Sequence, residues 1–119
     1  MLERRREQGD SLPSGNIITR ANLARTYIAK GDYEEAVRRL EELIREYQEL
    51  LGTTDLHIMR TKTILGRALR LANRFDEAEE VLTSNLADQR ILLEPGHPDI
   101  RETETQLGKS TEAREVPDR

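Results

Sequence analysis

The 119-residue sequence contains no cysteine and no tryptophan, and aromatic residues make up only 3% of it. Without cysteine, neither a disulfide framework nor a thiolate metal site can form. The scarcity of aromatic rings argues against a stacking platform for single-stranded nucleic acid. The formal net charge of -4 argues against a protein that binds duplexes, because such proteins usually carry a basic balance. We therefore expect no nucleic-acid partner.

Long apolar runs are also absent from the sequence. No segment approaches the roughly 20 apolar residues that span a bilayer, and the charged start of the chain is not followed by the apolar stretch of a signal peptide. The sequence thus predicts no membrane association and a cytoplasmic location. Apolar and charged residues each make up 35% of the chain. A thin core with a highly charged exterior is typical of a repeat array, in which each unit contacts only its neighbours.

The chain does contain an internal repeat at an offset of 42 residues. Residues 19–27 align with residues 61–69, and residues 31–36 align with residues 73–78, with apolar and small positions coinciding in both pairs. A partial third copy begins near Thr103. Periods of about 20–50 residues are typical of stacked architectures, in which one unit cannot bury its own apolar face alone. The repeat therefore predicts a helical solenoid.

Apolar spacing and turn signals predict five helices in antiparallel pairs and no strand. The predicted helices span about residues 17–30, 33–51, 56–71 and 75–93, with a fifth from about residue 99. Asn16 and Asp32 are the expected N-caps of the first two helices, and Gly31 is expected to end the first. Three small residues, Ala24, Gly66 and Gly108, hold equivalent positions where two helices are expected to approach closely.

The chain divides into three parts by composition. Residues 1–16 are expected to hold the remnant of a helix and a loop, residues 17–109 the helical repeats, and residues 110–119 a flexible polar tail. The N-terminal remnant looks like the end of a helix from a copy further upstream. On this interpretation the chain is a fragment, or a diverged end, of a longer array.

The repeated residues resemble the tetratricopeptide repeat. The resemblance lies in the pattern Leu-Ala/Gly-x-x-Tyr/Leu in the first helix of each pair and in Gly/Asn-x-Tyr/Phe-Glu/Asp-Glu-Ala at the turn. The 42-residue spacing and the loop at residues 93–99 are similar to the kinesin-light-chain variety, which is also widespread in large bacterial regulatory proteins. The resemblance implies an all-α fold, a right-handed superhelix of antiparallel helix pairs with about two and a half repeats. Asn85 departs from the pattern, because the earlier copy has Leu43 there.

The resemblance also implies a binding groove, because the first helix of each pair lines the inner face in this family. Carried over by position, the peptide-binding residues are Asn22, Arg25, Arg60, Thr63, Ile64, Arg67, Arg70, Gln106 and Lys109, and Glu102 also faces inward. Asn22 would hold the main chain of an extended peptide, as the equivalent residue does in the family. Arginine presents a planar fork of donors that suits carboxylates. The alternative is that these arginines are solvated or pair with glutamates on neighbouring helices.

No constellation in the sequence resembles an active site. His57 and His97 lie in or beside loops about 40 residues apart, whereas a metal site needs several converging ligands. We therefore expect no enzymatic activity and no cofactor. The leading hypothesis is a non-catalytic protein–protein interaction module that binds an extended, acidic peptide segment in its concave groove.

Two alternatives from other classes stay open at this point. The first is self-association into a homo-oligomer through exposed repeat ends, because arrays need polar caps for solubility. The apolar residues that would mediate it are Ile91, Leu92, Leu93, Ile100 and Leu107. The second is that the chain is the sensor or scaffold part of a larger bacterial regulatory protein.

Overall fold

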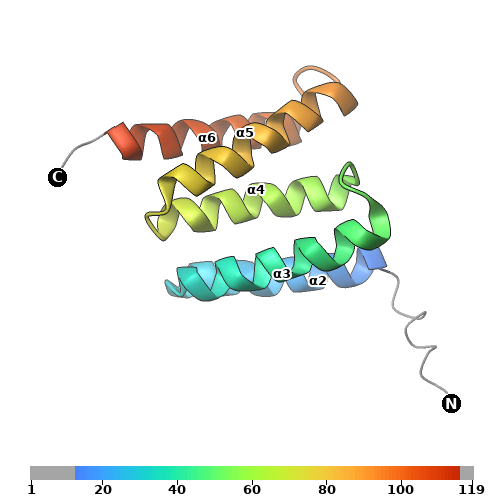
Figure 1. Cartoon of the computed structure of the whole chain (residues 1–119), viewed down its shortest axis with the longest axis horizontal. Coiled ribbons are helices and arrows are strands. Elements are labelled where there is room, and N and C mark those ends of the chain that lie inside the picture. The colour runs from blue at the N-terminus through green and yellow to red at the C-terminus, as the bar shows by residue number, and fades with distance from the viewer. Residues whose placement is uncertain (1–12, 116–119) are drawn as a thin grey trace, which may run out of the picture.

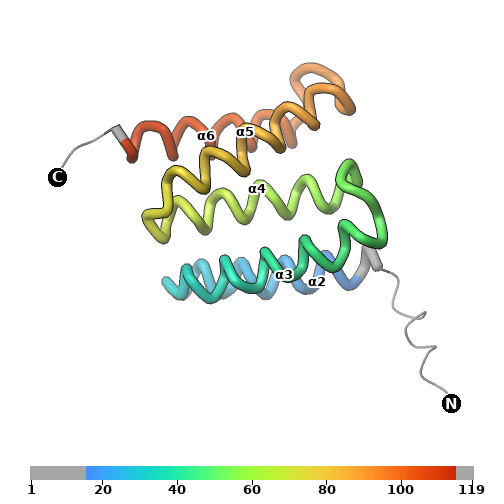
Figure 2. The backbone as a smooth tube through the Cα atoms, viewed as in Figure 1, coloured from blue at the N-terminus to red at the C-terminus, as the bar shows by residue number. Residues whose placement is uncertain are grey.

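The computed structural model describes residues 13–115, which form five α-helices and no strand. The helices are α2 (Pro13–Lys30), α3 (Tyr33–Leu51), α4 (Leu56–Leu71), α5 (Phe75–Leu92) and α6 (Pro98–Glu115). The antiparallel zigzag of these helices is clear in the backbone trace (Figure 2). The all-α fold predicted from the repeat is confirmed. Residues 1–12, which hold most of the predicted helix remnant and loop, lie outside the described residues.

The two helices at the ends of the array differ most from the predicted boundaries. α2 begins at Pro13, so Asn16 lies inside the helix and the prediction that it is the N-cap is wrong. Proline suits the first helical position, because its φ is already helical and no partner for an N–H is required there. α6 also begins at a proline, Pro98, and continues beyond Ser110 to Glu115.

The turns inside the two repeats have the same backbone geometry. Gly31 and Asn73 are equivalent in the repeat, and both have positive φ, 87° and 65° respectively. Asp32, which follows Gly31, donates its N–H to the Tyr27 carbonyl at 2.9 Å. Arg74, which follows Asn73, donates its N–H to the Leu69 carbonyl at 2.8 Å. This is the helix-ending motif that favours glycine and, after it, asparagine. The predicted end of α2 at Gly31 is therefore confirmed.

The N-cap residues of α3 and α4 differ in what their side chains do. The Asp55 carboxylate accepts hydrogen bonds from the N–H groups of His57 and Ile58 at the start of α4, at 2.8 and 3.3 Å. Asp32 precedes α3 at the N-cap position, as predicted, but its side chain makes no capping hydrogen bond. Its φ and ψ of -89° and 68° are not the extended values typical of a capping residue.

The helices form two layers. α2, α4 and α6 lie in one layer, with α4 in contact with both of the others, and α3 and α5 each pack across a pair of them (Figure 1). The molecule measures 58 × 34 × 19 Å along its principal axes. Because a helix with its side chains is about 10 Å across, the shortest dimension corresponds to the two layers. The layer of α2, α4 and α6 is the one that the sequence predicts to line a groove.

The close approach predicted at the small residues occurs in both complete repeats and fails in the partial third copy. Ala24 is fully buried, and a Cβ on Gly66 would lie within 2.4 Å of the Leu82 side chain of α5. Gly108 is exposed, and a Cβ there would meet nothing within 4 Å. The prediction is therefore wrong for Gly108, because no second helix among the described residues packs on this side of α6.

The core changes character along the array. Around α3 it is apolar, with Leu40, Leu43 and Ile58 almost completely buried. Around α5 it becomes polar, because Asn85 and Gln89 are also buried. The Asn85 amide donates to the Met59 carbonyl at 2.9 Å and to the Thr63 hydroxyl at 3.1 Å, whereas neither amide atom of Gln89 has a hydrogen-bond partner among the described residues. α6 therefore packs on a partly polar surface.

Candidate functional site

Two adjoining pockets open on the layer of α2, α4 and α6. The first has a volume of about 210 Å³ and is lined by Arg25, Arg60, Thr63, Ile64, Arg67, Asp99, Glu102 and Gln106. The second has a volume of about 230 Å³ and is lined by Ile17, Ile18, Ala21, Asn22, Arg25, His57, Arg60, Thr61 and Ile64. Because Arg25, Arg60 and Ile64 belong to both, the pockets form one continuous depression, which we call the groove.

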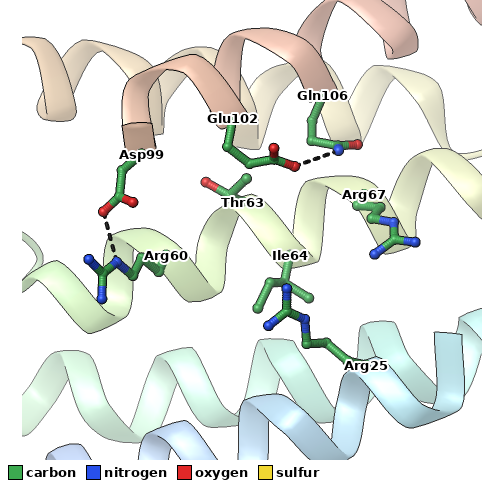
Figure 3. Close-up of a pocket in the computed structure, with 8 residues that line it drawn as sticks. All are labelled: Arg25, Arg60, Thr63, Ile64, Arg67, Asp99, Glu102 and Gln106. Carbon is green, nitrogen blue, oxygen red and sulfur yellow. Dashed lines mark hydrogen bonds and ion pairs between the residues drawn. The ribbon is translucent and has the colours of Figure 1, made fainter. Parts of the chain in front are cut away.

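α4 supplies the middle of the groove because its residues recur at helical spacing. Arg60, Ile64 and Arg67 are four and three positions apart, and such residues lie on one face of a helix. The close-up shows Arg25 reaching from α2 towards Ile64, with Asp99, Glu102 and Gln106 projecting from α6 on the other side (Figure 3). Ile64 is half-buried and gives the groove an apolar centre between polar walls.

The groove brings together most of the residues carried over from the family pattern. Those that line it are Asn22, Arg25, Arg60, Thr63, Ile64, Arg67 and Gln106. Arg70 and Lys109 do not line it. Lys109 is exposed outside both pockets, whereas Arg70 is half-buried and donates from one guanidinium nitrogen to the Gln106 side-chain oxygen at 3.1 Å. Burial lowers the pKa of Arg70, and the nearby positive charge of Arg67 lowers it further.

The α6 wall introduces negative charge into the groove. Asp99 accepts a hydrogen bond from the Arg60 side chain at 2.8 Å, so one of the predicted cationic residues is already paired. Glu102 accepts one from the Gln106 amide nitrogen at 2.8 Å (Figure 3). The family pattern did not point to Asp99. The signal available was its position directly after Pro98, at the start of the third copy of the groove-lining helix.

Two arginines of the groove have no carboxylate partner among residues 13–115. Arg25 and Arg67 are both exposed and line the same pocket from α2 and α4. The arginines at other places on the surface are mostly paired with glutamate or aspartate. Arg74, for example, bonds to both Glu77 and Glu34 at 2.8 Å. Arg25 and Arg67 therefore provide guanidinium groups that can bind an external anion.

Charge is segregated between the two layers of the repeat. α2 carries three lysine or arginine residues and α4 carries four, and neither helix contains a carboxylate. α3 carries six carboxylates and three arginines, and α5 carries five carboxylates and one arginine. An acidic protein thus has a basic inner layer in its two complete repeats. Such segregation raises the local concentration of anionic ligands near the groove.

Ion pairs with arginine lower the pKa values of several carboxylates on α3 and α5. A hydrogen bond from Arg74 lowers the pKa of Glu77 below its usual value, and a hydrogen bond from Arg20 does the same for Glu46. Hydrogen bonds from Arg38 and Arg39 lower the pKa of Glu35. The negative charges of these three carboxylates are thus compensated by arginines of the same chain.

The hydroxyl group of Thr63 is occupied by the core. It lies 2.8 Å from the Thr103 hydroxyl and 3.3 Å from the Met59 carbonyl, which compete for its single proton, and it accepts from Asn85. Thr103 in turn donates to the Asp99 carbonyl at 3.0 Å. Thr63 therefore shapes the groove and links it to α6, but its polar atom is not available to a ligand.

Both histidines lie at the start of a helix and take part in hydrogen bonds there. The ring nitrogen Nδ1 of His97 accepts the Asp99 N–H at 3.0 Å at the start of α6, so this side chain caps the helix. His57 lines the second pocket of the groove and donates its backbone N–H to Asp55. Residues 13–115 contain no group of three or more potential metal ligands. None of the helices that the structure describes is long and apolar enough to cross a bilayer.

Comparisons with known proteins agree with this architecture. A family model described as tetratricopeptide repeat matches residues 16–87, which is more than half of the chain. The chain is also similar, with a TM-score of 0.81 and 26% sequence identity, to a crystal structure of a protein from Podosopora anserina that is assigned as a kinesin light chain with nearly identical TPR-like repeats. The match covers 87% of this chain and 49% of that one, so the chain spans about half the length of the solved structure. No curated protein matches the chain.

Proposed function

The chain belongs to the tetratricopeptide repeat family, of the kind found in kinesin light chains, and on this premise we propose that its groove binds an extended, acidic segment of a partner protein. Repeats of this family generally mediate protein–protein interaction and act as non-catalytic scaffolds. The single observation that carries the finer proposal is that Arg25 and Arg67 share a pocket with the apolar Ile64 and have no ion-pair partner among residues 13–115.

The geometry of the groove supports an extended ligand. Its two pockets continue into each other across α2, α4 and α6, and neither is an enclosed cavity of the size that a small-molecule site usually has. Asn22 is exposed on α2 at the edge of the second pocket, where its amide can accept and donate to a main chain. A peptide that lies along the groove would present alternate side chains to Ile64 and to the arginines.

A direct test uses a charge reversal at the two unpartnered arginines. Fluorescence anisotropy with labelled, aspartate-rich peptides should give a Kd for the unaltered chain and a Kd at least about tenfold weaker for Arg25→Glu with Arg67→Glu, which corresponds to about 1.4 kcal/mol. Affinity should also fall as salt rises, because the contacts are solvent-exposed charges. Arg45→Glu is the matched control for each single reversal, Arg25→Glu or Arg67→Glu, because Arg45 is exposed on α3, outside both pockets.

The outcome of this comparison decides between the groove and other surfaces. If Arg45→Glu weakens binding as much as a single reversal in the groove does, net charge explains the effect and the groove is not the site. If neither variant changes the affinity, acidic peptides bind elsewhere. Circular dichroism of each variant checks that the helical content is unchanged.

Self-association is a second candidate, favoured by one observation. Ile91 and Leu92 at the end of α5 are 79% and 48% exposed, which is unusual for two adjacent large apolar residues. The other three residues expected in such an interface are less accessible, because Ile100 is buried and Leu93 and Leu107 are half-buried. Sedimentation of the chain over a wide concentration range tests this candidate. A concentration-independent monomer would exclude it.

Two further expectations from the sequence stay predictions. The first is the division of the chain into a helix remnant and loop at residues 1–16, a repeat domain at 17–109 and a flexible tail at 110–119. The second is its place in a larger bacterial regulatory protein. A cytoplasmic location likewise stays a prediction.

A further inference from the structure

The two sides of the groove carry charges of opposite sign. Arg25 and Arg67 line the first pocket from α2 and α4, and Glu102 lines the same pocket from α6 (Figure 3). Glu102 is exposed and accepts a hydrogen bond from the neutral amide of Gln106 at 2.8 Å. Across the described part of the chain, no cationic side chain forms an ion pair with it. One pocket therefore holds two cations and one anion that have no ion-pair partner within residues 13–115.

The other carboxylate of the α6 wall differs in this respect. Asp99 is only 16% exposed at its side chain and forms an ion pair with Arg60 at 2.8 Å. The Asp99 carboxylate is therefore neutralised by Arg60, which donates to it from Nε. Glu102 is the carboxylate that remains available, because its partner is uncharged and its surroundings are open.

We infer that the groove binds a segment of mixed charge, with an acidic group between Arg25 and Arg67 and a cationic side chain at Glu102. This inference rests on the proposed peptide-binding function and specifies the chemistry of the segment. A uniformly acidic peptide would place a carboxylate beside Glu102, and juxtaposed like charges at an interface are unfavourable. A lysine or arginine at this place instead gains a charge-assisted hydrogen bond.

Opposite charges at the two sides also fix the direction of the ligand. A peptide that ran in the reverse sense would bring its cation to Arg67 and its carboxylate to Glu102. Interfaces use such unfavourable pairings to exclude wrong partners and wrong registers. Glu102 is therefore a specificity-determining residue of the groove.

A positional peptide library tests the inference. Extended peptides in which each position is in turn aspartate, lysine, leucine or serine are titrated against the full chain by fluorescence anisotropy. The unaltered chain should select aspartate at one position and lysine at another. Glu102→Gln should lower the selection of lysine over serine about five- to tenfold, the size expected for one charge-assisted hydrogen bond, and leave the selection of aspartate in place.

Matched substitutions separate a local effect from a change in net charge. Glu112→Gln removes the same charge from an exposed residue of α6 that lines neither pocket, and it should leave both selections unchanged. Arg67→Gln should lower the selection of aspartate and leave that of lysine in place. Arg45→Gln on α3 is the control for this change.

The results distinguish failure of the inference from failure of the proposed function. If aspartate is selected and depends on Arg67 while lysine is selected nowhere, the groove binds acidic peptides and the inference is wrong. Selection of lysine that survives Glu102→Gln also overturns it. If no position shows charge selection that depends on Arg67 or Glu102, both the inference and the proposed groove are wrong.

Discussion

Gly66 of α4 lies against Leu82 of α5 so closely that a Cβ added to the glycine would come within 2.4 Å of the Cγ and Cδ2 atoms of the leucine. Leu82 is completely buried, so a shift of its side chain would disturb the core. The absence of a side chain at residue 66 therefore sets the distance between the two helices of the second repeat. Gly108, its equivalent in the third copy, has nothing within 4 Å of the same position.

The first prediction compares alanine at these two positions. Gly66→Ala should lower the free energy of unfolding by about 1–3 kcal/mol, because overpacking outweighs the better helix propensity of alanine. Gly108→Ala should raise it by about 0.5–1 kcal/mol, because only the propensity changes. Urea denaturation measures both. Equal effects of the two substitutions would contradict the helix packing described for the second repeat.

The second prediction concerns the caps. Asp55→Ala removes an acceptor from two N–H groups of α4 and should lower the free energy of unfolding by about 1 kcal/mol. Asp32→Ala should change it by less than about 0.5 kcal/mol, because the Asp32 side chain makes no capping hydrogen bond. Thermal unfolding of both variants decides the matter. A larger loss for Asp32→Ala would mean that its position at the turn, rather than capping, matters.

The third prediction concerns the polar core beneath α6. Amide hydrogens of α6 should exchange faster than those of α4, because the core around α5, on which α6 packs, contains the buried polar side chains of Asn85 and Gln89 as well as apolar ones. Gln89→Leu removes two buried polar atoms that have no partner among the described residues, so it should stabilise the protein by about 1–3 kcal/mol. It should also slow exchange in α6. Exchange in α2 should be unchanged and serves as the internal control.

The fourth prediction concerns pH. The pKa values of Glu46 and Glu77 are lowered in the folded protein by hydrogen bonds from Arg20 and Arg74. A lowered pKa in the folded state means that the stabilisation is present above the unfolded value near 4.5 and is lost as the pH falls through the lower folded values. The urea midpoint should therefore be lower at about pH 3 than at pH 7.

The effect of pH should depend on these arginines. Arg74→Gln removes the pairs with Glu77 and Glu34 and should reduce the difference between the two midpoints. Arg101→Gln should not, because Arg101 is exposed and forms no ion pair with the described residues. A fall in stability that is the same in both variants would assign the pH dependence to other carboxylates. Each effect should be small, because these are exposed pairs.

The fold could be predicted from the sequence because the two copies of the repeat can be compared position by position. Gly31 and Asn73 occupy equivalent positions, and both are residue types that tolerate the positive φ of a helix end. Agreement between two copies identified the turns and the helix pairs more reliably than either copy alone. The ends of the array have no second complete copy for comparison. The predictions of the start of α2 and of the packing at Gly108 were accordingly wrong.

The site was predictable in outline for the same reason, and its details were not. The resemblance to the family placed Arg67 and Arg70 among the inward residues. Arg67 lines the groove, but Arg70, about one helical turn further along α4, donates to Gln106 instead. The pair between Arg60 and Asp99 joins residues 39 positions apart in different repeats. Contacts of this kind depend on how one helix pair stacks on the next, which the repeat pattern does not specify.

The most direct test of the account is amide chemical-shift mapping of the labelled chain during titration with an extended peptide that carries aspartate and lysine. We predict that shifts concentrate on α2, α4 and α6 around Arg25, Ile64, Arg67 and Glu102, and that they disappear in Arg25→Glu with Arg67→Glu. Shifts confined to the outer helices α3 and α5, or to Ile91 and Leu92, would contradict the assignment of the groove as the binding site.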